Sequence, residues 1–172
     1  AYHFAYPNVK QVYQGDVWTR IKSNRTLVNS FGRKWFFQGA FRDMSVPFAF
    51  PAQSNTADTI NRQALIPLWY DPKFKEVQLL RQVHDSVEFQ IPISVGVDRM
   101  FQILKDLKSE AEKPLHWKGM DFVIPLDIEA GLRLDPTEKI TIDQQGEIKL
   151  AALIKQAERL QAVENQIFGK EN

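Results

Sequence analysis

Apolar side chains recur at alternate positions along two neighbouring runs in the middle of the chain. These are Val77, Leu79 and Val83, with Arg81 in the same row, and then Val87, Phe89 and Ile91. A period of two is typical of β-strands, because successive side chains point to opposite faces of a sheet. Only His84, Asp85 and Ser86 separate the two runs. A connection this short predicts a β-hairpin that holds His84 and Asp85 at its apex.

Apolar residues recur at helical spacing in several other segments. This spacing predicts a helix over residues 7–21 and a second helix over residues 52–66, which Pro67 is expected to end. A third predicted helix is capped by Ser94 and continues to Ala111.

Three further segments predict strands. Residues 26–29 and 34–37 flank Gly32, where a turn needs a residue that tolerates positive φ. Residues 122–128 alternate in the same way. Together these elements predict an α+β domain over residues 1–131, with a mainly antiparallel sheet covered by helices.

Residues 132–172 form a C-terminal extension of different character. A polar stretch, residues 135–145, leads into a predicted amphipathic helix. The apolar stripe of this helix, near heptad spacing, comprises Leu150, Leu153, Ala157, Leu160 and Ile167. Such a stripe needs a cover, which is either the helix's own domain, the commoner arrangement, or a partner protein.

The composition is that of a folded, soluble protein, since 44% of the 172 residues are hydrophobic and 25% are charged. No apolar run approaches the roughly 20 residues that span a bilayer, and residues 1–10 lack the pattern of a signal peptide, so neither membrane association nor secretion is expected. There is no cysteine, which excludes disulfides and thiolate metal sites and favours a cytoplasmic location. Any bound metal should be a hard ion held by carboxylates.

Charge is distributed unevenly along the chain. Residues 1–42 hold seven Lys or Arg against one acid, Asp16, which leaves a charge of +6. Residues 121–147 hold seven acids against Arg133 and Lys139, which leaves −5. A polyanion is attracted to the first segment and repelled by the second, unless the uneven distribution merely reflects solvated surface charges.

Short motifs near the hairpin carry a resemblance to one enzyme family. The apex segment Gln82-Val83-His84-Asp85-Ser86 resembles QVHDE, the signature called motif C in family A DNA polymerases, the bacterial DNA polymerase I type. Upstream, residues 51–58 are similar to the family's P-x-Q-G-T-A-A-D segment, and they match it at Pro51, Gln53, Ala57 and Asp58.

Weaker matches extend this similarity over residues 2–131. Residues 31–34 look like the family's G-R-R turn, and residues 6–9 resemble its Y-P-x-V helix start. Residues 114–131 are similar to the strand that closes such polymerases.

The resemblance implies the C-terminal palm of a polymerase, with the end of its fingers. Such an enzyme is a DNA-directed DNA polymerase, a nucleotidyltransferase that adds dNTPs to a DNA primer-template with two Mg²⁺ ions. Asp85 corresponds to a catalytic, metal-binding aspartate of the family. Ser86 stands where the family has glutamate and is expected to contact a metal-bound water. The implied location is the cytoplasm of a bacterium or of a phage-infected host cell.

Further residues are expected at the DNA by the same resemblance. Gln53 would hydrogen-bond in the minor groove, unless it is an ordinary polar residue at a helix N-terminus. His84, with Gln82 beside it, would contact the primer-terminal backbone, unless it only stabilises the turn. Arg33 and Lys34 would contact phosphates, unless they are ordinary surface charges.

Two essential parts of the family pattern are missing from the sequence. One is the D-[YF]-S-x-[IL]-E strand with the other palm aspartate, and the second is the nucleotide-binding helix with its Arg, Lys and Tyr. The chain is therefore expected to be a subunit of a split, phage-type polymerase or an excised fragment, completed by an N-terminal polymerase portion. A non-catalytic DNA-binding remnant of the palm and a scaffold with a partner-binding tail helix are the alternatives.

Overall fold

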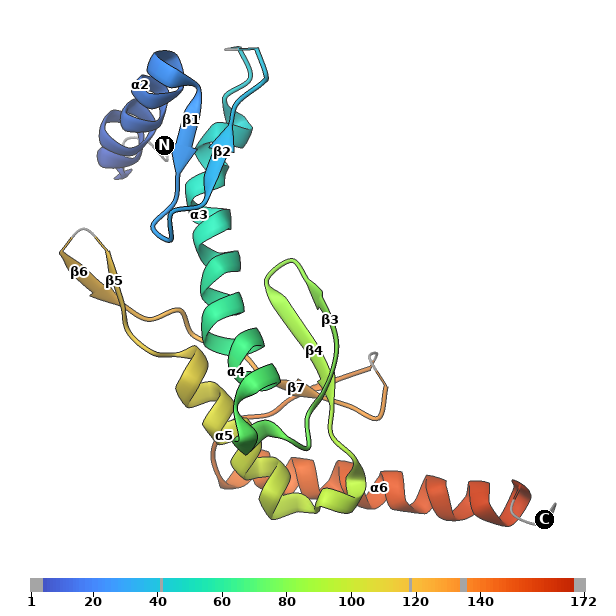
Figure 1. Cartoon of the computed structure of the whole chain (residues 1–172). Helices are drawn as coiled ribbons and strands as arrows, with labels where there is room; N and C mark the ends of the chain where they lie inside the picture. Colours follow the sequence, from blue (N-terminus) through green and yellow to red (C-terminus); the bar gives the residue numbers. More distant parts are fainter. Residues whose placement is uncertain (1–4, 41, 118, 134–135, 169–172) are drawn as a thin grey trace. The chain divides into compact units, whose positions relative to one another are not determined.

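A computed structural model describes residues 5–40, 42–117, 119–133 and 136–168, without the side chains of residues 117, 167 and 168. The chain divides into two compact units, Ala1–Thr59 and Ile60–Asn172, and each unit is described by itself (Figure 1). Helices and short antiparallel strands occur in both units, which confirms the predicted α+β class. Among the described residues, no helix combines the length and the apolar character needed to cross a membrane.

The first unit packs helices and a hairpin around one apolar core. Its elements are a π-helical turn at Val9–Gln14, α2 (Gly15–Asn24), β1 (Thr26–Val28), β2 (Lys34–Phe36) and α3 (Ser45–Ile60). The buried core comprises Val17, Ile21, Leu27, Phe37 and Met44. Gly32 lies in the turn between the strands with φ at 84°, where a residue without Cβ is favoured. The first predicted helix and the two strands around Gly32 are thus confirmed to within a few residues.

The second predicted helix is longer than its sequence pattern indicates. α3 begins before the predicted start at residue 52 and contains Pro51. It continues through a π-helical segment, Asn61–Leu65, into α4 (Ile66–Tyr70), so the expected end at Pro67 is wrong. Pro67 is one of the first two residues of α4, a position where the missing N–H of proline is tolerated.

The second unit is arranged around its longest buried helix, α5. After α4, its elements are β3 (Gln78–Val83), β4 (Ser86–Gln90), α5 (Val97–Ala111), β5 (Leu115–Trp117), β6 (Met120–Phe122), β7 (Glu129–Ala130), β8 (Glu138–Lys139) and α6 (Gln144–Phe168). Short 3-10 turns occur at Pro72–Phe74 and Ile93–Val95.

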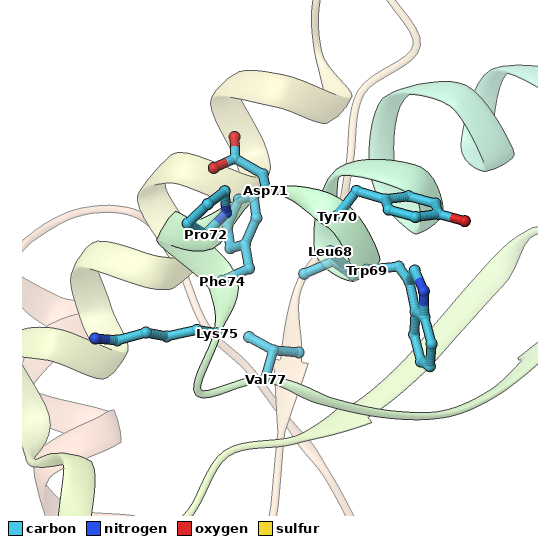
Figure 2. A pocket seen from close by; sticks show the side chains of 8 residues that line it. All are labelled: Leu68, Trp69, Tyr70, Asp71, Pro72, Phe74, Lys75 and Val77. Carbon is cyan, nitrogen blue, oxygen red and sulfur yellow. The ribbon is translucent and has the colours of Figure 1, made fainter.

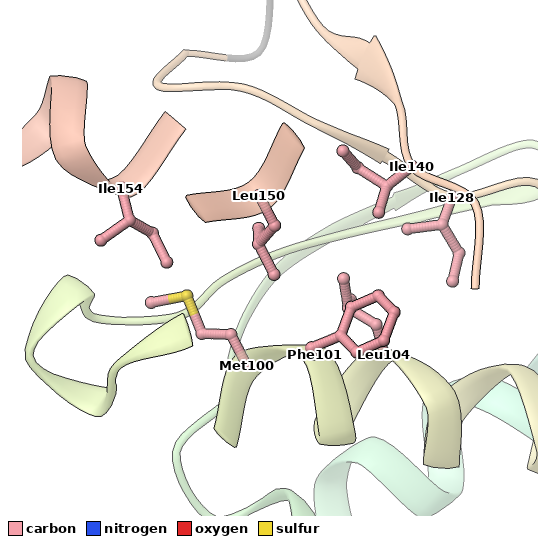
Figure 3. Packing of buried hydrophobic residues seen from close by; sticks show 7 residues of the cluster. All are labelled: Met100, Phe101, Leu104, Ile128, Ile140, Leu150 and Ile154. Atoms are coloured by element: carbon pink, nitrogen blue, oxygen red, sulfur yellow. The ribbon is translucent and has the colours of Figure 1, made fainter. Parts of the chain in front are cut away.

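Two apolar clusters share α5. The first comprises Ala64, Leu68, Phe74, Ile103 and Leu107. The second, shown in Figure 3, comprises Met100, Phe101, Leu104, Ile128, Ile140, Leu150 and Ile154. Because both clusters take their side chains from one broad face of α5, the helix is amphipathic, as its sequence pattern predicts.

The tail helix belongs to this second core. Leu150 and Ile154 are buried in the second cluster and Leu153 packs against it, which confirms packing on its own domain for the first half of α6. Farther along, Leu160 is exposed, and the side chain of Ile167 lies outside the described part. The two compact units divide between residues 59 and 60, and the predicted extension from residue 132 lies within the second of them.

The strands form separate pairs instead of the predicted sheet. Among the described residues each strand pairs only with its neighbour in sequence, which gives four antiparallel hairpins, β1–β2, β3–β4, β5–β6 and β7–β8. The predicted strand over residues 122–128 is wrong beyond Phe122, since residues 123–128 have no strand assignment. Pro125 in this segment lacks the N–H that a ladder requires.

The start of α5 also differs from its prediction. Gly96, at φ 83°, is the residue that precedes Val97, and no side chain caps the helix there. Ser94 lies inside the preceding 3-10 turn, so it is not the cap. The chain turns at glycine because a left-handed φ suits a residue without Cβ.

Candidate active-site hairpin

The β3–β4 hairpin is tighter than the sequence pattern indicates. Val83 pairs with Ser86, so Ser86 already belongs to β4 and only His84 and Asp85 form the turn. The Ser86 hydroxyl donates a hydrogen bond to the Val83 carbonyl at 2.8 Å, and this bond joins the two residues that flank the turn. The predicted apex position of His84 and Asp85 is confirmed.

His84 adopts an unusual backbone conformation at this apex. Its φ is 52°, in the left-handed region that residues with a Cβ seldom enter. Holding a residue other than glycine there costs roughly 1–2 kcal/mol. Backbone strain of this kind gathers at functional sites, where the surrounding structure over-determines it. A two-residue hairpin turn commonly needs positive φ at its first position, and His enters the left-handed region more readily than most residues with a Cβ.

Asp85 presents an exposed carboxylate at the end of the hairpin. No hydrogen bond or ion pair joins this carboxylate to the described part of the chain, so both oxygens are open to an external ligand. Carboxylate oxygens are the ligands that Mg²⁺ prefers. Among the described residues no group of three or more His, Asp or Glu is placed to hold a metal ion. Asp85 thus fits one ligand of a metal site and does not complete such a site.

One side of the hairpin packs against the core of its unit. Leu79, Val87 and Phe89 contact the apolar cluster to which α5 contributes Ile103 and Leu107. Packing against a buried helix gives the apex a rigid support, which a metal ligand requires.

The two strands are also held together by their own side chains. Arg81 and Glu88 pair across the strands, with Nε donating to Oε2 at 2.5 Å. The hydrogen bond that Arg81 donates to Glu88 raises the pKa of the Arg81 guanidinium, and the Glu88 charge adds to this effect. The register shifts between Leu79 and Arg81, and Leu80 at this bulge is 49% exposed.

A second group of predicted site residues lies in the first unit. The turn between β1 and β2 is tied to α3 by Asp58, which accepts hydrogen bonds from Asn29 Nδ2 at 2.6 Å and from Arg33 Nε at 3.0 Å. The Asp58 side chain is only 11% exposed. Asp58 also raises the pKa of Arg33, first through its hydrogen bond and then through its charge. Asn55 adds a hydrogen bond by accepting from the Ser30 N–H.

This network brings two of the matched motifs together. Residues 31–34 carry the turn, and residues 51–58 supply the side chains that hold it. The sequence match at Asp58 does not predict this structural role. The only sign in the sequence is that Asp58 lies in a predicted helix and that Asn29 and Arg33 lie upstream near a predicted turn. This pattern does not specify that the three side chains interact.

Removing the Asp58 carboxylate should destabilise the first unit. In Asp58→Ala the buried Nδ2 of Asn29 loses its acceptor, and an unsatisfied buried donor costs about 1–3 kcal/mol. Asp16→Ala is the matched control, because Asp16 pairs with Arg20 on an exposed helix face. Urea denaturation would measure both changes. Equal midpoints for the two variants would show that the Asp58 network contributes no more than a surface ion pair.

The remaining predicted residues are exposed. Gln53 lies within α3 and not at its N-terminus, so the simple helix-start alternative does not apply. Lys34 is exposed on β2, and Gln82 is exposed on β3. Gln53, Arg33 and Lys34 belong to the first unit, whereas Gln82, His84 and Asp85 belong to the second.

One pocket lies in the second unit, near the start of β3. It has a volume of about 240 Å³ and is shown in Figure 2. It is lined by Leu68, Trp69, Tyr70, Asp71, Pro72, Phe74, Lys75 and Val77. None of the predicted site residues lines this pocket, so it is separate from the exposed hairpin apex.

Comparison with known proteins finds no family model, curated protein or solved structure that matches the chain. Assignment of a function therefore depends on the residues and geometry of the hairpin and of the β1–β2 turn.

Proposed function

We propose that this chain is the palm portion of a DNA polymerase resembling family A, and that it supplies one metal-binding aspartate and several primer-template contacts. The observation that carries the proposal is the apex of the β3–β4 hairpin. There a free carboxylate, Asp85, adjoins a histidine held at positive φ on a rigidly packed support. The order of the matched motifs along the sequence supports the same function.

In this proposal Asp85 contributes one ligand to the Mg²⁺ site, and the second palm aspartate comes from an N-terminal polymerase portion. Bound Mg²⁺ would stabilise the negative charge on the transferring phosphoryl group. Ser86 uses its hydroxyl proton in the bond to Val83, so toward a metal-bound water it acts as an acceptor. The exposed apolar side chain of Leu80 on β3 is available to pack against the missing portion.

Other residues position the DNA. His84 contacts the primer-terminal backbone beside Asp85, with Gln82 adjacent on β3, and Gln53 hydrogen-bonds in the minor groove without reading sequence. Arg33 gives Nε and Nη2 to Asp58, so Nη1 is the nitrogen left for a phosphate. Lys34 contacts phosphate directly, since no hydrogen bond or ion pair joins its ammonium group to the described residues.

The experiment is primer extension. The purified chain alone should incorporate no dNTP, because it supplies only one of the two aspartates that hold the metal ions. Adding a partner that carries the other palm aspartate and the nucleotide-binding helix should give Mg²⁺-dependent extension, and the partner alone serves as control. Robust extension by the purified chain would refute the split site.

A non-catalytic DNA-binding module is the second candidate, and the charge of the first unit favours it. Residues 1–59 hold seven Lys or Arg against three acids. If this candidate is correct, the chain binds primer-template but supports no extension with any partner. Failure of both binding and extension would leave the scaffold alternative.

A further inference from the structure

The outer face of the β1–β2 hairpin combines an exposed aromatic ring with a free cation. In the register of the hairpin, Thr26 lies opposite Phe36 and Val28 lies opposite Lys34. Strand alternation places these four residues on one face, while Leu27 is buried on the opposite face. Phe36 is 56% exposed, although large aromatic side chains usually bury most of their surface.

Lys34 and Phe36 are neighbours on this face because they are two residues apart on one strand. Unlike Arg33, whose guanidinium is held by Asp58, Lys34 is not paired with any described residue. A flat ring and a mobile ammonium group side by side form a minimal site for one nucleotide, with the base on the ring and the phosphate on the cation.

The charge of the whole unit favours the same ligand. Seven Lys or Arg against three acids leave residues 1–59 at +4, and two of those acids are already paired with Arg20 and Arg33. Residues 60–172 hold fifteen Lys or Arg against eighteen acids, which leaves −3. A polyanion is therefore attracted to the unit that carries this face. An apolar protein surface would gain nothing from that charge.

We infer that the outer face of the β1–β2 hairpin binds single-stranded nucleic acid, with an unpaired base stacked on Phe36 and its backbone phosphate on Lys34. Duplex DNA does not suit the ring, since its base faces are covered by stacking. This inference rests on the proposed polymerase function for its biological ligand, which is then the unpaired template strand. Stacking uses the π-face that every base has, so the site reads no sequence.

The test uses the full chain and a fluorescein-labelled oligothymidylate of about twelve nucleotides, followed by fluorescence anisotropy across a salt series. Phe36→Ala should weaken binding by about 5- to 100-fold, the range expected for loss of one base–aromatic stack, and Phe36→Tyr should retain it. Lys34→Ala should lower the slope of log affinity against log salt by about 0.7, whereas Phe36→Ala should leave the slope unchanged. Because Phe36 is exposed, the thermal melting curve of Phe36→Ala should match that of the parent chain.

Trp69→Ala is the matched control, since Trp69 is also a highly exposed aromatic residue but lies in the acidic unit. Its loss should not change affinity. Unchanged affinity in Phe36→Ala would overturn the inference. The inference would also be overturned if Phe36→Ala lost assembly with the polymerase partner while its oligonucleotide affinity stayed unchanged. That result would identify the face as a protein interface. Oligonucleotide binding needs neither the partner nor Mg²⁺, so failed primer extension does not affect this test, and a failed binding test leaves the polymerase proposal standing.

Discussion

Replacing Asp85 by asparagine in the reconstituted polymerase should lower nucleotide incorporation by several orders of magnitude. The change keeps the size of the side chain and much of its hydrogen-bonding capacity, but it removes the negative charge that would hold Mg²⁺. Stabilisation of charge on the transferring phosphoryl group supplies most of the catalysis in such reactions. The two-residue turn should survive, because its closing hydrogen bond joins Ser86 to Val83 and does not involve residue 85. Primer extension under single-turnover conditions measures the loss.

DNA affinity separates this effect from a general failure to bind. Asp85→Asn removes a negative charge close to the primer phosphates, so affinity for primer-template should stay the same or rise slightly. A large drop in affinity would mean that Asp85 supports DNA binding by another route and that it is not chiefly a metal ligand.

Glu88→Gln is the matched control on the same hairpin. It removes one carboxylate charge, but the Glu88 carboxylate pairs across the strands with Arg81 and not at the apex. Incorporation by this variant should stay within a few-fold of the parent, since exposed ion pairs contribute little. Comparable losses from both substitutions would show that the apex is not the metal site, and normal activity in Asp85→Asn would end the polymerase proposal.

The hairpin could be predicted from sequence because its information is local. Period-two alternation on both sides of His84 and Asp85 specifies two strands and a short connection, and the structure confirms both. The exact turn could not be predicted, since the choice between two and three residues depends on the pairing of Val83 with Ser86. The positive φ of His84 has no sequence signal, because glycine is the residue that usually marks it.

The predicted helix boundary is wrong where proline was expected to end the helix. Proline is costly inside an α-helix because it removes one hydrogen bond, but its missing N–H is tolerated at the first two residues of α4. The segment Asn61–Leu65 lies immediately before α4, which contains Pro67. Nothing in the period of the apolar residues distinguishes such a segment from an ordinary helical turn.

Long-range pairing is the other information that local patterns lack. The predicted sheet required strands to find partners far along the chain, and the described strands pair only with adjacent ones. The Arg33–Asp58 contact joins two motifs that lie far apart in the sequence. For the candidate site, the sequence predicts the same phosphate contact for Arg33 and Lys34, and the structure distinguishes them. Arg33 pairs with Asp58, whereas no hydrogen bond or ion pair joins Lys34 to the described residues.

The second large effect concerns the tail. Deleting residues 135–172 should unfold the second unit or reduce its stability severely, because the deletion removes three buried side chains from one cluster. Ile140, Leu150 and Ile154 are each less than a tenth exposed. Burial of one such side chain contributes about 1.5–3 kcal/mol, so the loss approaches the roughly 5–15 kcal/mol by which whole proteins are stable. Met100, Phe101 and Leu104 of α5 would become exposed at the same time.

Deleting only residues 158–172 is the control, and it should leave the melting temperature nearly unchanged. This shorter deletion keeps Leu150 and Ile154 in the cluster and removes Leu160 and Val163, which are both more than half exposed. Circular dichroism melts of the two deletions separate the two halves of α6. If the longer deletion melts like the parent chain, the packing of α6 does not stabilise the unit. The shorter deletion can also prevent reconstitution of polymerase activity while its melting curve stays unchanged. In that case the partner binds the exposed half of α6, because exposed apolar side chains that do not stabilise their own domain are typical of a protein interface.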